Sequence, residues 1–158
     1  MSYSYFNASS HRVQDNENYF LDANIWLKVL VPKNKQSHKD RSYSEFFDKL
    51  IGNTKVRIVV PALVLSEVIN RIIREVHYEK YLKNVRKNQP ETIIDASFYK
   101  NVYRNSQEYI IAYRLICDDI KSFSTSIDLI NDEFGTTFKF KHILSDPPAS
   151  LDFNDYYY

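Results

Sequence analysis

Apolar and polar positions follow two different periods along this chain. Short apolar runs at residues 19–23 and 55–60 are rich in aromatic or β-branched residues and predict two buried strands. Each run leads into a segment with helical spacing, first at residues 24–31 before Pro32 and then at residues 61–87. This succession of strand, helix, strand and helix predicts one α/β domain with a parallel sheet.

Weaker patterns divide the rest of the chain. Residues 32–41 are polar and basic and predict a loop, and the spacing of Phe46, Phe47 and Leu50 predicts a helix that stops at Gly52. Four further segments are expected in turn: helix at 95–134 with a break near Asp118, an extended piece at 135–143, a loop at 144–150, and a helix start at 151–158. We place residues 1–17 in a flexible N-terminal arm and residues 18–158 in a single domain.

Composition excludes several function classes. The net charge is only +1, so RNA binding requires a local basic patch rather than bulk charge. The chain has 2 glycines and no glycine-rich nucleotide-binding motif. The single cysteine, Cys117, allows neither an internal disulfide nor a cysteine zinc cluster and fits a reducing cytosol. Because the sequence opens without a signal-peptide pattern and has no apolar run of roughly 18 residues, we expect a cytoplasmic protein without a membrane span.

Four carboxylates lie at the end of a predicted strand or near the start of a predicted helix. Asp22 ends the first strand, Glu67 lies early in the helix after the second, and Asp152 and Asp155 lie three residues apart in the last helix start. Ligands of parallel α/β sheets bind at the carboxyl ends of the strands, so we expect these distant acids to meet. Clustered carboxylates repel one another unless a cation lies between them, and oxygen ligands suit Mg²⁺ or Mn²⁺. The pattern predicts metal-dependent phosphodiester hydrolysis.

Each acid also has a simpler interpretation. Asp22 or Asp152 would serve as a helix N-cap, and Asp155 would be stabilised by the helix dipole. Glu67 interrupts an apolar helical face, and a glutamate is rarely buried without a charged partner. Its simpler interpretation is that this face is rotated and Glu67 is exposed to solvent. Asn24 either orients Asp22 or a metal-bound water, or only begins a helix. On the residues alone, both the metal site and these simpler interpretations stay open.

Basic and aromatic side chains offer a second set of contacts. Arg71 and Arg74 follow Glu67 by about one and two helical turns and, with Lys39 and Arg41, are the predicted contacts to an RNA backbone. Simple exposure to solvent is the alternative for all four. Helical tyrosines are expected mostly in the core or an interface, with base stacking as the minor option; they are Tyr99, Tyr103, Tyr109 and Tyr113.

Three segments carry a family resemblance. "FLDANIWL", "VVPALVLSEVINR" and "LDFND" together resemble the PIN domains, the fold of many toxin ribonucleases of the VapC type. The matching positions are Asp22 with Asn24, the pair Ser66 and Glu67, and Asp155. The resemblance covers residues 18–75 and 148–158. The middle of the chain resembles the family only in being helical.

The resemblance implies a fold and an activity. The fold is a three-layer α/β/α domain with a short parallel sheet flanked by helices and, here, a helix-rich middle segment. The activity is a Mg²⁺- or Mn²⁺-dependent endoribonuclease. The resemblance implies Asp22, Glu67 and Asp155 as its metal ligands, with Asp152 assisting and Asn24 and Ser66 supporting the ligands. A toxin–antitoxin partnership and a homodimer belong to the same implication. The family continues with a strand carrying a fourth acid, so a sequence ending at Tyr158 predicts a C-terminus truncated relative to the family. A catalytically inactive module that binds RNA or protein is the alternative function.

Overall fold

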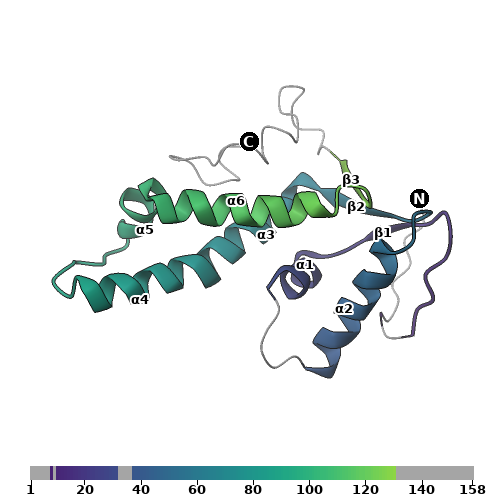
Figure 1. Cartoon of the computed structure of the whole chain (residues 1–158), viewed down its shortest axis with the longest axis horizontal. Coiled ribbons are helices and arrows are strands. Elements are labelled where there is room, and N and C mark those ends of the chain that lie inside the picture. The colour runs from purple at the N-terminus through teal and green to yellow at the C-terminus, as the bar shows by residue number, and fades with distance from the viewer. Residues whose placement is uncertain (1–7, 9, 32–36, 131–158) are drawn as a thin grey trace.

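A computed structural model describes residue 8 and residues 10–31 and 37–130 of the chain, which form a mixed α/β structure (Figure 1). The remaining residues are not described. The elements follow in the order β1 (Asn18–Phe20), α1 (Ala23–Leu30), α2 (His38–Ile51), β2 (Arg57–Pro61), α3 (Ala62–Ile72), a π-helical segment η1 (Ile73–Tyr78), α4 (Glu79–Asn88), α5 (Phe98–Asn101), a 3-10 turn η2 (Tyr103–Asn105), α6 (Gln107–Ser122) and β3 (Ile127–Ile130).

The sheet is parallel, as the strand–helix alternation predicts, with strand order β1-β2-β3. Tyr19, Ile58 and Ile127 are register partners across the three strands, and all three are buried. This row anchors the sheet in the core. The carboxyl ends of β1 and β2 therefore lie side by side, which is the arrangement that brings Asp22 and the start of α3 together.

The strand β3 corrects the expectation of helix from residue 95 to 134. Residues 127–130 read I-D-L-I, in which the apolar positions fit either a short strand or a helical face. Pairing with β2 decides between them, because the backbone of Ile127–Ile130 finds hydrogen-bond partners along Ile58–Pro61. The expected break near Asp118 is also wrong, since Asp118 lies inside α6.

The actual break lies before α6. Ser106 accepts a hydrogen bond from the Tyr109 backbone N–H at 3.2 Å and so caps the new helix. The other predicted break, after residue 87, is confirmed, because α4 ends at Asn88.

A basic loop was expected at residues 32–41, but helix α2 already begins at His38. Ser37 and Asp40 form a capping box: Ser37 Oγ accepts from the Asp40 backbone N–H, and the Asp40 carboxylate accepts from the Ser37 backbone N–H. Lys39 and Arg41 therefore belong to the first turn of a helix. The predicted stop at Gly52 is confirmed.

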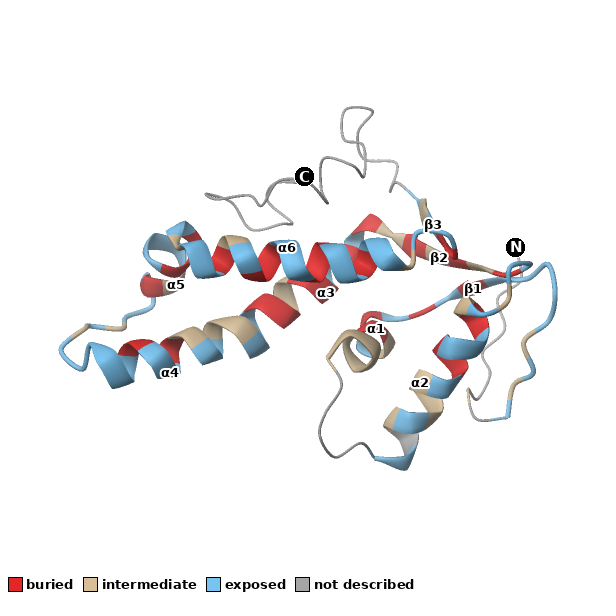
Figure 2. Cartoon of the chain, in the orientation of Figure 1, coloured by how far each residue is buried: buried red, intermediate tan, exposed pale blue. Residues whose placement is uncertain are grey.

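Aromatic side chains contribute much of the core between the sheet and its helices. Figure 2 shows where the buried positions lie along the elements. Phe47 of α2 is 2% exposed and meets Trp26 of α1 and Phe123 edge-on, at ring-centroid distances of 5.4 and 5.0 Å. The predicted buried role of the tyrosines is confirmed for Tyr103, Tyr109 and Tyr113. Tyr99 is partly buried and packs against the same core.

A long helix leads away from the sheet. The bounds of α3, η1 and α4 are contiguous, so helical backbone runs without interruption from Ala62 to Asn88. Segment α6 packs back against α3 and η1 on the return path, and Figure 1 shows the two forming an arm beside the sheet. Within the described residues, no helix is both long enough and apolar enough to cross a bilayer.

Candidate functional site

Asp22 lies two residues beyond β1, at the carboxyl end of the strand. Its backbone carbonyl accepts the first helical hydrogen bond, from the Ile25 N–H at 2.9 Å, and its Oδ2 accepts from the Asn24 N–H at 3.4 Å. The expected helix-cap interpretation is therefore confirmed for Asp22. The Asn24 side-chain amide also donates to Oδ2, at 2.8 Å, and so fixes the direction of the carboxylate. Capping uses one carboxylate oxygen, so it leaves the other available to a ligand.

Glu67 lies in α3, the helix that follows β2. Its neighbours Ser66 and Val68 are buried, whereas the Glu67 side chain is 53% exposed. The face that carries Glu67 is thus turned toward solvent, which was the alternative to a buried, charge-paired glutamate. Ser66, the preceding residue of the same helix, is buried, and its supporting role beside the carboxylates stays a prediction.

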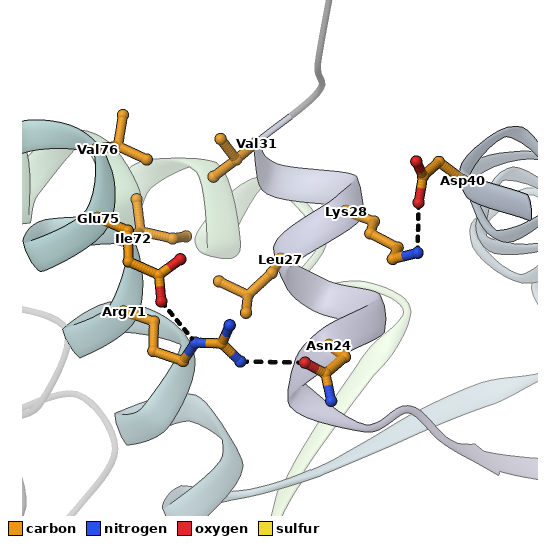
Figure 3. Close-up of a pocket in the computed structure, with 9 residues that line it drawn as sticks. All are labelled: Asn24, Leu27, Lys28, Val31, Asp40, Arg71, Ile72, Glu75 and Val76. Carbon is orange, nitrogen blue, oxygen red and sulfur yellow. Dashed lines mark hydrogen bonds and ion pairs between the residues drawn. The ribbon is translucent and has the colours of Figure 1, made fainter. Parts of the chain in front are cut away.

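Arg71 connects the two acids. Its Nη1 donates to Asn24 Oδ1 at 3.1 Å and lies 3.7 Å from Glu67 Oε1, while its Nε donates to Glu75 Oε1 at 3.0 Å. The Asn24 amide spans from Asp22 to Arg71, so that one polar chain runs from the end of β1 to the exposed face of α3 and η1. Figure 3 shows the part of this chain that joins Asn24, Arg71 and Glu75. Asp22 and Glu67, which we call the acid pair, are thus linked through two intervening side chains, Asn24 and Arg71.

The structure brings only part of the predicted site together. Asp152 and Asp155 lie outside the described residues, as does the Lys39 side chain. Within the described part of the chain, no group of three histidine, cysteine, aspartate or glutamate side chains is placed to hold a metal. The acid of the third strand, Asp128, lies in mid-strand and pairs with Arg57 Nε at 3.8 Å.

The remaining predicted RNA contacts are separated from one another. The Arg74 guanidinium stacks over the Tyr99 ring at 5.0 Å, on the long helix. Arg41 is exposed on the first turn of α2. Arg71 contacts residues of the acid pair's network, namely Asn24, Glu67 and Glu75.

A groove of about 180 Å³ opens beside Arg71. Its floor is apolar and its rim carries charges of both signs (Figure 3). It is lined by Asn24, Leu27, Lys28, Val31, Asp40, Arg71, Ile72, Glu75 and Val76. On the far rim Lys28 forms an ion pair with Asp40, and hydrogen bonds from Lys28 and Ser37 lower the pKa of Asp40 to about 2.

Sequence reasoning missed Glu75 and the pair of Lys28 and Asp40. Glu75 was detectable, because an arginine and a glutamate four residues apart share a helical face. The pair of Lys28 and Asp40 was not, because it joins two helices across a predicted loop.

Comparisons of the chain with protein-family models, with curated proteins and with solved structures found no match.

Proposed function

We propose that the chain is a PIN-like, metal-dependent endoribonuclease whose site is built on Asp22 and Glu67. The observation that carries the proposal is the polar chain from Asp22 through Asn24 and Arg71 to Glu67, at the carboxyl ends of two adjacent parallel strands. This is where α/β sheets bind their ligands. The three-layer arrangement and the PIN family itself are part of the proposal.

The chemistry of the donors fits Mg²⁺ or Mn²⁺. Hard divalent cations take carboxylate oxygens and are often held by one or two carboxylates together with waters and substrate phosphates. Asp22 and Glu67 supply two such groups, both exposed, and Asp155 with Asp152 would add others from residues outside the described part. A bound divalent ion supplies an activated water and stabilises charge on the phosphoryl group.

Asn24 and Arg71 position the carboxylates and the substrate phosphate. Asn24 holds the Asp22 carboxylate by its side-chain amide, so Asp22 presents a fixed oxygen toward the site. Arg71 offers guanidinium donors in a planar fork, the geometry that matches phosphate oxygens. Arg71 therefore has two roles: it balances the charge of the acids, and it contacts the scissile phosphate when RNA is bound.

The partner biology rests on the resemblance alone. A toxin of this type pairs with an antitoxin protein that covers the active site, and homodimers are common. We include both in the proposal, together with a cytoplasmic location.

Metal-dependent cleavage of RNA by four variants tests the proposal. Asp22→Asn and Glu67→Gln each keep the shape of the side chain and remove its charge, and each should lower the single-turnover rate at least about 100-fold, since even residues that only support metal ligands cost about 10- to 100-fold. Asp119→Asn and Glu45→Gln make the same changes at exposed positions on α6 and α2 and should cleave like the wild type. Equal rates in all five proteins would reject the mechanism.

One observation favours a second function, a non-catalytic binding module. Arg71 already places a positive charge among Glu67, Glu75 and Asn24, so the described acids are partly compensated by the protein itself. This function predicts RNA binding that persists in EDTA and no cleavage with either metal.

A further inference from the structure

Helix α4 carries an uneven distribution of charge. Its ten residues include four cations, Lys80, Lys83, Arg86 and Lys87, and one anion, Glu79. All five side chains are exposed. The net charge of the whole chain is +1, so this one short helix holds a positive charge of three in an otherwise balanced protein. Among the described residues, α4 is thus a local concentration of positive charge.

The cations lie on the side of α4 that faces away from the protein. Leu82 and Val85 are buried against Phe98, and at 100° per residue their mean direction is opposite to that of Lys80, Lys83 and Lys87. These three residues, which we call the lysine stripe, are all exposed and therefore form one row along the outer surface of the arm. None of the three forms an ion pair with another described residue.

The stripe lies on the same continuous helix as the acid pair's network. Glu67 and Arg71 belong to α3, and the helix continues through η1 into α4 without a break. At about 1.5 Å per residue, the stripe begins about 20 Å from Glu67 and extends a further 10 Å or so. This distance corresponds to several nucleotides of an extended strand. A single RNA could reach both surfaces.

The neighbours of the stripe favour a polyanion over other partners. Asn84, Asn88 and Arg86 flank the lysines, and none of the ten residues of α4 exposes a large apolar side chain. A protein partner would need apolar anchors, and a membrane-binding helix would need an apolar face to insert. Evenly spaced cations among amides match a phosphate backbone, whose contacts are electrostatic and independent of sequence.

We propose that the lysine stripe of α4 is an RNA-backbone-binding surface, separate from the acid pair, that holds the substrate strand beyond the cleavage site. That the ligand of this surface is RNA rests on the proposed function. Lys80, Lys83 and Lys87 contact phosphates, and Arg86 adds a fourth contact at the edge. The surface raises affinity for long RNA and takes no part in the chemistry.

Fluorescence anisotropy with a labelled single-stranded RNA of about 16 nucleotides, in EDTA, measures this surface without cleavage. Four phosphate contacts on α4 and one from Arg71 predict that the wild-type association constant falls about 130-fold between 50 and 200 mM salt, since each contact contributes about 0.7 to the logarithmic slope. The triple variant Lys80→Gln, Lys83→Gln, Lys87→Gln keeps good helix formers and should lose only about sevenfold over the same range.

A second triple variant controls for net charge. Lys49→Gln, Lys55→Gln and Lys121→Gln change the total charge by the same amount on other elements and should bind RNA with the wild-type salt dependence. Unchanged affinity and slope in the α4 variant would overturn the proposal. So would binding of anionic phosphatidylserine vesicles through the stripe by a protein that does not bind the RNA.

The outcomes separate this inference from the proposed function. If the stripe binds RNA but no metal supports cleavage, the nuclease proposal fails and the surface stands. If cleavage depends on Glu67 while the α4 variant binds and cleaves long RNA like the wild type, the nuclease stands and the surface fails.

Discussion

Replacing Arg71 by methionine removes the cation that joins the acid pair while keeping the stem of the side chain. The structure assigns Arg71 three contacts: Asn24 Oδ1 at 3.1 Å, Glu75 Oε1 at 3.0 Å and Glu67 Oε1 at 3.7 Å. Arg71 is 37% exposed, so these contacts are screened by solvent. Ion pairs of this kind contribute about 0.2–1 kcal/mol each and the hydrogen bond to Asn24 about 0.5–1.5 kcal/mol. We expect Arg71→Met to lower the free energy of unfolding by about 1–2 kcal/mol.

The same substitution has the opposite effect on metal binding. Arg71 and a divalent cation compete for the Glu67 carboxylate, and at 3.7 Å in a water-like dielectric the attraction between Arg71 and Glu67 is about 1 kcal/mol. Removing it should tighten Mn²⁺ binding about fivefold. Cleavage should nevertheless become slower, because the guanidinium that contacts the phosphate is gone. A less stable protein that binds metal more tightly is the signature of this arrangement.

Isothermal titration with Mn²⁺ and urea denaturation measure the two effects. Arg114→Met, at an exposed arginine of α6, makes the same change away from the acid pair and should alter neither. Metal affinity that is unchanged or weaker in Arg71→Met would refute the reasoning, because it would mean that Arg71 and the metal do not share Glu67.

Three further predictions concern the fold and its titrating groups. Phe47→Ala should cost about 3–5 kcal/mol in urea denaturation, since the ring is 2% exposed and lies between two other aromatic rings; a cost below about 1 kcal/mol would contradict this packing. The pKa of Asp40 is lowered from 3.8 to about 2, so its interactions stabilise the fold above about pH 4 and are lost as the pH falls toward 2. Asp40→Asn should therefore flatten the pH dependence of the melting temperature between pH 4 and pH 2. An unchanged profile would argue against the ion pair of Asp40 with Lys28. Burial raises the pKa of the Cys117 thiol to about 12, so iodoacetamide should modify it at pH 8 only after unfolding, as mass spectrometry would show.

The first half of the fold was readable from the sequence because its local signals agree with its tertiary contacts. The apolar runs that became β1 and β2 are flanked by clear helical periods, and the parallel pairing follows from that alternation. Ser106 was the missed signal for α6, since a serine at this position accepts from the backbone three residues later. Strand β3 could not be read locally, because only its pairing with β2 distinguishes I-D-L-I from a helical turn.

The candidate site was readable only in outline. The position of Asp22 after the first strand and of Glu67 in the helix after the second predicts that they lie at one edge of the sheet. In the structure Asp22 follows β1, Glu67 lies in α3, and Asn24 and Arg71 link the two. The Asn24–Arg71 contact joins residues 47 apart, so no local spacing reveals it. The ion pair of Lys28 with Asp40 was hidden for a different reason: the start of α2 depends on the capping box at Ser37, which the polar composition of that segment conceals.

A double-mutant cycle on single-turnover RNA cleavage tests the central claim most directly. If Asp22 and Glu67 serve one metal-dependent site, either substitution, Asp22→Asn or Glu67→Gln, removes most of the activity, and the double variant should be only slightly slower than the worse single variant. Independent, multiplying effects of the two substitutions, or wild-type cleavage by the double variant, would contradict the claim that these two acids act together.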